Sequence, residues 1–251
     1  MHPPPLLTSL ADVPLQLKTA GWAVIDNAVL CSLCDVATPS LLAWQVHWPA
    51  LPSDDHLRDG GRYRRRRHGC FIVSADEMRA VPHRAHWQPV EYNALHGGFE
   101  RWFEPLPAAL VDDGAFRCLL QGLAGVADRL RGAAAWSVEV HPLRIDTTGG
   151  IGRPTPEGAH RDGVDLVVVL LVERHNIKGG ETRVFDALGP QGVRFTLTEP
   201  FSALLLDDER VIHETTPIQP LDAAQPSWRD TLVLTYRRGG FQGSAQQGRT
   251  A

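Results

Sequence analysis

His160 and Asp162 stand two residues apart in the segment EGAHRDGVD at 157–165 and could together bind a metal ion. We expect this segment to begin a strand. Residues i and i+2 of a strand point to the same face, which would bring the imidazole and the carboxylate together. The pair alone is weak evidence, because chance predicts roughly 0.8 His-x-Asp pairs in a chain of this composition.

His213, in the strand-like segment LLLDDERVIHETTPI, supplies a third candidate ligand. Two histidines and one carboxylate on one face of an octahedral metal leave three positions open, which is the arrangement of non-haem Fe(II) oxygenases. A closed structural zinc site would need four protein ligands. Asp165 is a rival carboxylate, but its odd spacing from His160 places it on the other face of the expected strand, so Asp162 is preferred.

An oxygenase of this type needs an electron source besides the metal. A 2-oxo acid that chelates two of the open positions would leave the last one for O₂. Its far carboxylate calls for an arginine with a hydroxyl beside it. Arg229 and Thr231 share one face of the last expected strand and fit this requirement. Arg237 lies on the same face and remains an alternative to Arg229.

The elements that must position these residues change in character near residue 135. A helix ended by Gly21 is expected to lead into a strand at Trp22–Ile25, and apolar residues at helical spacing predict a helix over Ala115–Arg131. Short apolar runs separated by turn residues follow and predict an antiparallel sandwich or barrel. These runs are Trp136–Ile145, His160–Glu173, Glu181–Phe185, Val193–Leu197, Ala203–Leu206, Val211–Pro217 and Thr231–Arg238.

The length of 251 residues, with 23 Gly and 19 Pro, favours one domain built of short elements. We expect this domain over 1–238, with a helix-rich part at 1–135 and a β core at 136–238. The residues at 239–251 are expected to form a mobile tail. The run LVVVLLV at 166–172 is apolar at every position and should be a central strand covered on both faces.

Composition and charge exclude several classes of protein. A net charge of −4 argues against a nucleic-acid partner, so the basic run at 62–67 is interpreted as a solvated strand rather than a phosphate-binding patch. No apolar segment reaches the length of a membrane span, and no signal peptide is recognised, so we expect no membrane partner and a cytoplasmic location. The four cysteines do not form a zinc-binding set and are interpreted as reduced thiols.

Several motifs resemble the 2-oxoglutarate/Fe(II) dioxygenase family that contains bacterial L-isoleucine 4-hydroxylase and the biofilm-stress-motility proteins. The resemblance is strong over 137–238 and looser in GWAVID and GGRYRRRRHGCF upstream. It implies a mainly β fold with helices, a double-stranded β-helix or distorted, cupin-like jelly roll with the helices packed outside. The motifs that carry it are HRDGVD at 160–165, NIKGGET at 176–182, DDERVIH at 207–213, TTPI at 215–218 and WRDTLVLTYR at 228–237.

The resemblance implies His160, Asp162 and His213 as iron ligands and Arg229 as the anchor for 2-oxoglutarate. The expected cofactors and cosubstrates are Fe(II), 2-oxoglutarate and O₂. The expected reaction is hydroxylation of a small molecule, with a free aliphatic L-amino acid as the expected substrate and release of succinate and CO₂. A homodimer is left open.

Charged residues near the ligands are candidates for substrate binding. A substrate carboxylate would need a cation, for which Arg144 and the alternating arginines at 62, 64 and 66 are candidates, with Arg64 preferred among the three. Glu157 or Asp165 could bind an ammonium group. Two other functions remain open: metal-assisted hydrolysis or isomerisation on a cupin-like barrel, and a non-catalytic metal-binding protein of stress response or biofilm formation.

Overall fold

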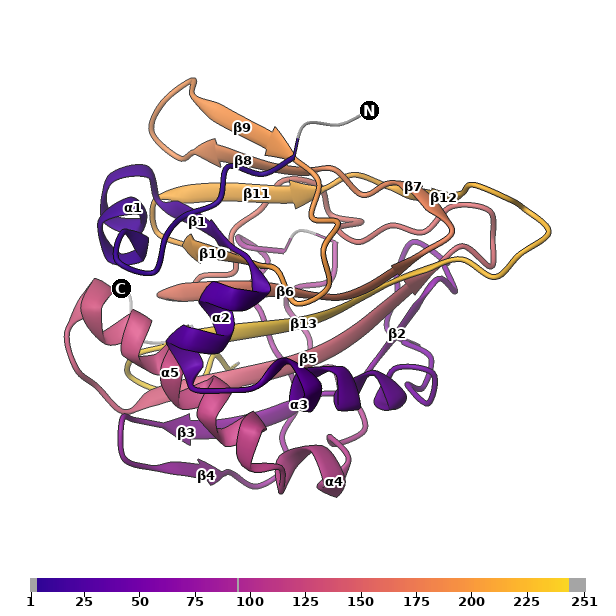
Figure 1. The fold of residues 1–251 in the computed structure, drawn as a ribbon. Helices are drawn as coiled ribbons and strands as arrows, with labels where there is room; N and C mark the ends of the chain where they lie inside the picture. The colour runs from indigo at the N-terminus through magenta and orange to yellow at the C-terminus, as the bar shows by residue number, and fades with distance from the viewer. Residues whose placement is uncertain (1–3, 94, 244–251) are drawn as a thin grey trace.

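A large antiparallel sheet forms the centre of the fold (Figure 1). The computed structural model describes residues 4–93 and 95–243. Within them, the sheet has the strand order β1-β10-β6-β13-β5-β3-β4, and β2 also pairs with β5. Its strands are β1 Trp22–Ile25, β2 Arg64–Arg66, β3 Gly69–Val73, β4 Met78–Ala80, β5 Trp136–Asp146, β6 Leu166–His175, β10 Ala203–Asp207 and β13 Trp228–Arg237.

Two smaller antiparallel sheets face the large one. The first has the order β11-β8-β9 and the second pairs β12 with β7. Together with the large sheet they form a double-stranded β-helix, as expected from the sequence, with the helices outside it. Their strands are β7 Ile177–Gly179, β8 Thr182–Asp186, β9 Gly192–Phe195, β11 Val211–Thr215 and β12 Ile218–Pro220.

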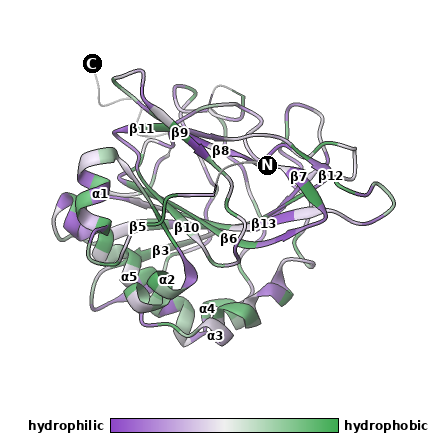
Figure 2. Ribbon diagram, turned by 45° about the horizontal axis from the view of Figure 1, so that its top comes forward, coloured by the Kyte–Doolittle hydropathy of each residue, from purple (hydrophilic) through white to green (hydrophobic). Residues whose placement is uncertain are grey.

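Helices cover the outer face of the large sheet, and both surfaces are rich in hydrophobic residues (Figure 2). The apolar face of the long helix α5 contributes Leu119, Leu123 and Val126 to this core, and the Tyr236 hydroxyl of β13 donates to the Leu120 carbonyl at 3.0 Å. The helices are α1 Val13–Ala20, α2 Asn27–Cys34, α3 Thr38–Ala43, the 3₁₀ helix η1 Trp44–His47, α4 Ala108–Val111 and α5 Gly114–Arg131.

The strand β6 is central, as its apolar run predicts. Alternate residues point to opposite faces, so Val168 and Leu170 pack with the helices while Val167 and Leu171 pack with the small sheet. The expected helix before Gly21 and the expected helix before Gly132 are also confirmed. The basic run contains the short strand β2, and β3 follows it; both join the large sheet together with β1 and β4.

Gly21 shows why the chain turns sharply between α1 and β1. Its φ of 78° lies in the left-handed region, which favours glycine. A Cβ atom there would lie 2.6 Å from Cγ1 of Val211, so no larger residue fits beside β11. The turn brings β1 into register with β10 at the edge of the large sheet.

No single helix in the described ranges is long and apolar enough to cross a membrane. Only α2 together with α3 and η1 passes that test, as a pair bent by 103°.

Of the expected mobile tail, Gln242 contacts the barrel: its Nε2 donates to the carbonyls of Asp162 and Gly163 at 2.9 Å. Residues 244–251 of that tail lie outside the described residues.

Candidate active site

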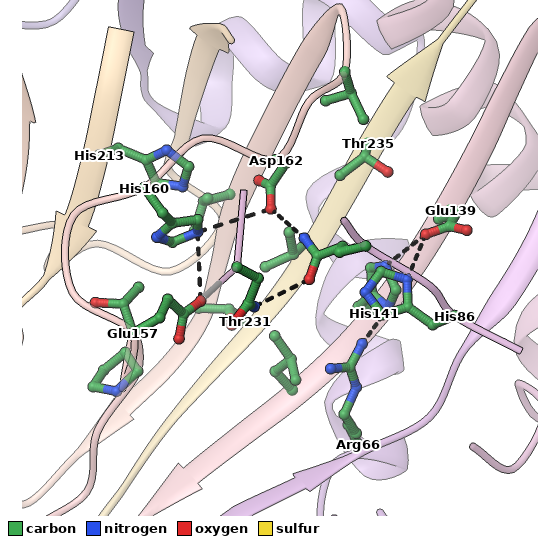
Figure 3. A pocket seen from close by; sticks show the side chains of 18 of the residues that line it. Arg66, His86, Glu139, His141, Glu157, His160, Asp162, His213, Thr231 and Thr235 are labelled. Atoms are coloured by element: carbon green, nitrogen blue, oxygen red, sulfur yellow. Dashed lines mark hydrogen bonds and ion pairs between the residues drawn. The ribbon is translucent and has the colours of Figure 1, made fainter. Parts of the chain in front are cut away.

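A cavity opens inside the β-helix, between the large sheet and the small ones (Figure 3). Its floor is made by the odd-numbered positions of β5 and β13, because alternate side chains of a strand share a face. These are Ser137, Glu139, His141, Leu143 and Ile145 from β5, and Arg229, Thr231, Val233, Thr235 and Arg237 from β13.

The three expected iron ligands lie together at one side of this cavity. The backbones of His160 and His213 exchange two hydrogen bonds, of 3.0 and 2.9 Å, which place their rings 4.6 Å apart. An Asp162 carboxylate oxygen lies 3.8 Å from Nε2 of His160. One ligand atom from each of the three residues lies within 4.8 Å of the others, a spacing at which one metal ion can contact all three.

The local structure around Asp162 differs from the expected strand, and that prediction is wrong. The backbone N–H groups of Asp162, Gly163 and Val164 all donate to the carboxylate of Asp208, at 2.7 to 3.1 Å. These groups cannot also pair in a ladder, so the chain forms a loop, and β6 begins only at Leu166. The loop, rather than strand alternation, brings His160 and Asp162 together.

The protonation of these side chains suits a cation. Nδ1 of His160 lies 2.9 Å from the Gly158 carbonyl and donates to it, which leaves Nε2 as the nitrogen that can bind a metal. Burial lowers the pKa of His160, but the carboxylates of Asp162 and Glu157 outweigh it and raise this pKa, so a metal ion would take the place of a proton on Nε2. Burial holds the pKa of His213 well below its usual value, so that ring is neutral. Burial also raises the pKa of Asp162, and burial together with Asp162 raises the pKa of Asp208 to about 7. A bound cation would offset this repulsion between carboxylates.

Gln88 fixes the orientation of the Asp162 carboxylate. Its Nε2 donates to Oδ1 of Asp162 at 2.9 Å, while its Oε1 accepts hydrogen bonds from Asn93 and Arg101. Gln88 comes from the irregular segment between β4 and α4 and is buried. A group that orients a metal ligand in this way typically contributes a factor of about 10–100 to metal affinity.

Replacing Gln88 by Met should therefore weaken metal binding by about 10- to 100-fold, because the apolar side chain cannot orient Asp162. Equilibrium dialysis against Mn(II) measures the dissociation constant. Gln191→Met, at an exposed position outside the cavity, is the matched control. An unchanged dissociation constant in the folded Gln88 variant would show that Asp162 needs no such support.

Arg229 has the environment expected of an anion anchor. It lines the cavity, is 4% exposed, and its Nε has no hydrogen-bond partner among the described residues. Burial, followed by the neighbouring guanidinium of Arg174, lowers the pKa of Arg229 to about 9. A carboxylate of 2-oxoglutarate bound here would supply the missing partner and offset the repulsion between the two arginines.

Thr231, expected beside Arg229, and Arg237, the alternative anchor, also line the cavity. Thr231 is the next inward residue of β13 and is 2% exposed. Arg237 lies at the far end of the strand, where its Nη1 donates to the Gly240 carbonyl. Of the two candidate arginines, Arg229 is thus the more deeply buried and has the unpartnered Nε.

Two of the four proposed substrate contacts lie outside the cavity. Arg144 is at an even-numbered position of β5, so it points away and forms a two-bonded ion pair with Asp230, at 2.8 and 2.6 Å. Asp165 accepts the backbone N–H of Arg238 at 2.8 Å and lies 3.5 Å from Arg131. The structure therefore removes Arg144 and Asp165 as substrate-binding candidates.

The other two candidates, Arg64 and Glu157, line the cavity. One carboxylate oxygen of Glu157 lies 3.6 Å from Nε2 of His160, and the other is buried without a partner in the described structure. The interpretation of the basic run as a solvated strand is wrong for Arg64 and Arg66, which are 6% and 5% exposed. Strand alternation buries these two and leaves Arg65 half-buried on the other face.

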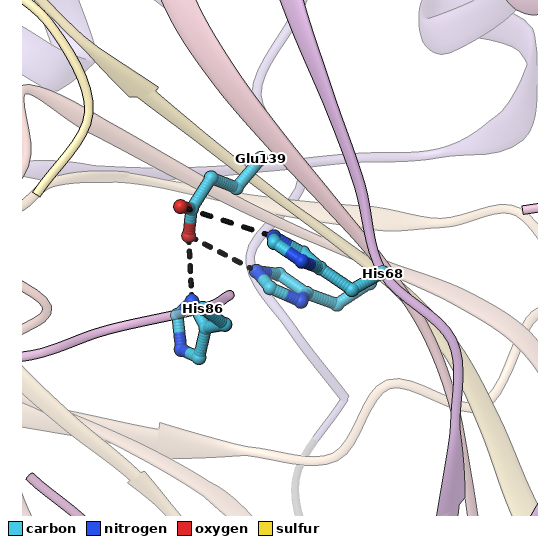
Figure 4. A group of neighbouring side chains, drawn as sticks. His68, His86 and Glu139 are labelled. Atoms are coloured by element: carbon cyan, nitrogen blue, oxygen red, sulfur yellow. Dashed lines mark hydrogen bonds and ion pairs between the residues drawn. The ribbon is translucent and has the colours of Figure 1, made fainter. Parts of the chain in front are cut away.

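A second group of side chains near the cavity also meets the distance requirement for a metal site (Figure 4). It consists of His68, His86, Glu139 and His141, all buried, and the sequence analysis did not identify it as a site. Nδ1 of His86 lies 2.7 Å from the Glu139 carboxylate, and Nε2 of His141 and of His68 lie 3.6 and 3.8 Å from it.

Hydrogen bonding indicates a buried carboxylate surrounded by neutral histidines here, rather than a metal centre. Arg66 can only donate, so Nδ1 of His141, 2.6 Å from Nη2 of Arg66, must accept, and the proton of this neutral ring lies on Nε2. The rings of His68 and His141 are stacked at 4.8 Å with an angle of 9°. Burial keeps the pKa of His86 and His141 well below the usual value and that of His68 near 4.

Replacing His86 by Ala should leave the metal content unchanged and lower the free energy of unfolding by about 1–3 kcal/mol, because Glu139 loses a buried hydrogen-bond donor. Metal analysis and urea unfolding test the two parts separately. A drop from two bound metal ions to one would instead identify these four side chains as a second metal site.

Comparison with known proteins gives the family. The model of the 2OG-Fe dioxygenase family matches residues 45–235, which is more than half of the chain. A crystal structure of a bsmA homolog from Methylobium petroleophilum PM1 is 51% identical, with a TM-score of 0.90 and coverage of 96% of this chain and 97% of that one. None of the curated proteins compared with the chain matches it.

Two more distant structures share the fold. IDO from Bacillus thuringiensis is 17% identical, with a TM-score of 0.74 and coverage of 96% of this chain and all of that one. The Fe(II)/α-ketoglutarate-dependent dioxygenase TqaL is 20% identical, with a TM-score of 0.68 and coverage of 93% and 91%. The family model that matches residues 45–235 and the 51% identical bsmA homolog show that the chain belongs to the 2OG-Fe dioxygenase family and is an Fe(II)- and 2-oxoglutarate-dependent dioxygenase.

Proposed function

We propose that this enzyme hydroxylates a free aliphatic L-amino acid. In the balanced reaction, the substrate C–H, O₂ and 2-oxoglutarate give the C–OH product, succinate and CO₂. The observation that best supports a 2-oxo-acid cosubstrate is the buried Arg229, which lines the same cavity as the metal-ligand cluster and whose Nε has no partner among the described residues. A hydrolytic cupin-like site has no need of such an anchor.

The proposed iron ligands are His160, Asp162 and His213, which together supply two nitrogen donors and one oxygen donor. Bound Fe(II) would supply the activation of O₂. Because the protein would occupy only three coordination positions of the metal, the others would be open to 2-oxoglutarate and O₂. Gln88 keeps the Asp162 carboxylate oriented. Arg229 and Thr231 would hold the far carboxylate of 2-oxoglutarate.

The cavity wall supports an amphipathic substrate. Val164, Val169 and Val233 line it and offer an apolar surface for an aliphatic side chain. Arg64 and Glu157 line the same cavity and are the proposed contacts for the carboxylate and ammonium groups of an amino acid. Enclosure by these residues would keep bulk water from the reacting C–H bond.

Succinate formation from 2-oxoglutarate, with Fe(II), ascorbate and each free L-amino acid in turn, tests the substrate class. We expect one or more aliphatic amino acids to stimulate succinate release well above the rate without substrate. If only peptides or other acids stimulate it, the amino-acid assignment is wrong, although the dioxygenase assignment stands.

A further inference from the structure

Three arginines line the cavity, and Figure 3 shows one of them, Arg66, on the side away from His160 and His213. Arg64 and Arg66 come from β2, and Arg101 comes from the irregular segment before α4. Their exposed fractions are 6%, 5% and 2%, so these three guanidinium groups are almost completely removed from water. Arginine is rarely buried to this extent unless its charge is balanced.

Each of these guanidinium groups is fixed by a buried partner. Nε of Arg64 donates to Asp54 at 2.7 Å, Nη2 of Arg66 to His141 at 2.6 Å, and Nη2 of Arg101 to Gln88 at 2.8 Å. Each group also has a second nitrogen, buried and without a partner in the described structure. These nitrogens are Nη2 of Arg64, Nε of Arg66 and Nε of Arg101.

Three carboxylates, those of Asp54, Glu139 and Glu157, act on the group of three arginines. The acidic groups that act most directly on Arg66 are Asp54 and Glu139, and the histidines beside Glu139 are neutral. Burial and then Arg64 lower the pKa of Arg66 to about 9 and that of Arg101 to about 10. In the proposed function Glu157 binds the ammonium group of the substrate, which leaves Asp54 and Glu139 to balance three guanidinium groups. A carboxylate of the same substrate would restore the balance.

We propose that Arg64, Arg66 and Arg101 bind a carboxylate of the substrate, so that the substrate class is a carboxylic acid held by this group of arginines in the cavity. The buried, unpartnered N–H groups provide directed donors for carboxylate oxygens. That the bound acid is the substrate rests on the proposed function. The pocket combines two of the alternating arginines considered from the sequence, Arg64 and Arg66, with Arg101, which the sequence analysis did not identify.

The same residues connect this pocket with the iron ligands. Arg101 donates to Gln88, and Gln88 donates to Asp162, at 2.8 and 2.9 Å. A carboxylate that holds Arg101 in place would also hold Gln88, which makes Gln88 a positioning residue between substrate and metal. Binding of the acid should then strengthen metal binding and, by thermodynamic reciprocity, metal should strengthen binding of the acid by the same factor.

Calorimetry on the protein loaded with Mn(II) and N-oxalylglycine, a non-reactive 2-oxoglutarate analogue that occupies the cosubstrate site, tests the proposal. The probes are the twenty L-amino acids and the straight-chain and branched C4–C8 monocarboxylic acids, each paired with its primary amide. We expect at least one acid to bind about thirty-fold or more tightly than its amide, as for a buried charge pair. Absence of acid binding, or equal binding of acid and amide, would overturn the proposal.

Variants locate the pocket. Arg66→Gln and Arg101→Gln should remove the preference for acid over amide, whereas Arg65→Gln, on the outer face of the same strand, should keep it. If the Gln variants fail to fold, Arg66→Lys and Arg101→Lys, which retain the charge, replace them. The comparison of each acid with its amide in the wild-type protein needs no variant. Folded Gln variants with the wild-type preference would assign the carboxylate to another site.

The coupling and the enzyme function have separate readouts. In Gln88→Met, addition of the acid should no longer change the Mn(II) dissociation constant, although the acid should still bind. Succinate formed from 2-oxoglutarate without substrate reports the proposed enzyme function alone. Its presence together with equal binding of acid and amide would refute the pocket and leave the dioxygenase, whereas its absence would count against both.

Discussion

Alanine at His160, Asp162 or His213 should reduce bound iron from about one equivalent per chain to background and abolish succinate formation. Each substitution leaves only two of the three donors, and two donors do not hold Fe(II) against water. Atomic absorption on anaerobically loaded protein measures the metal, and circular dichroism measures the fold. His175→Ala, at an exposed histidine stacked on Trp228 at 4.2 Å, is the matched control.

The three variants should still fold, because the hydrophobic core lies between the sheets and helices and not at the metal. Asp162→Ala even removes a carboxyl whose pKa burial raises beside Glu157. Wild-type iron content in all three folded variants would disprove the proposed ligand set.

Arg229→Ala should weaken binding of 2-oxoglutarate by about 2–5 kcal/mol, or about thirty-fold to several thousand-fold in the dissociation constant. The variant removes a buried guanidinium and leaves a carboxylate without its charge-assisted partner. Anaerobic calorimetric titration of 2-oxoglutarate into metal-loaded protein measures the effect. Arg237→Ala, on the same strand face, is the comparison, and a loss of binding there with none in Arg229→Ala would identify Arg237 as the anchor.

Regular elements were predictable because their patterns are periodic. The helix α5 follows from apolar residues on one face and from Gly132 at its end, and β6 follows from seven consecutive apolar residues. The positions of Arg229 and Thr231 in the cavity follow from alternation along β13. Strand alternation depends only on the chain itself, so these inferences need no knowledge of distant residues.

The loop with two of the metal ligands was not predictable in the same way. The carboxylate of Asp208, some 46 residues downstream, captures three backbone N–H groups and prevents a strand at 160–164. His160 and Asp162 still converge, but for a reason that the spacing does not contain. Arg144 lies on β5 as expected, but its even-numbered position points it to the outer face, where it pairs with Asp230.

The surroundings of the three arginines were predicted only in part, for two different reasons. Arg101 and Gln88 lie in the segment between β4 and α4, which has no periodicity from which their direction could be read. Arg66 was one of the alternating arginines considered as substrate contacts, and alternation along β2 correctly places it on the same face as Arg64. Glu139 was missed because the residue of β5 expected at the site, Arg144, lies on the opposite strand face. The net charge of −4 obscured the group of arginines, because a few buried arginines hardly alter the total.

Mass spectrometry after reaction under ¹⁸O₂ tests the central conclusion most directly. With an amino acid that stimulates turnover, one labelled oxygen should appear in succinate and one in the hydroxylated product, in equal amounts. Both labels should be lost in His160→Ala. A hydroxylated product without labelled succinate, or labelled products undiminished in the folded His160 variant, would contradict the assignment of this cavity as the site of an Fe(II)- and 2-oxoglutarate-dependent dioxygenase.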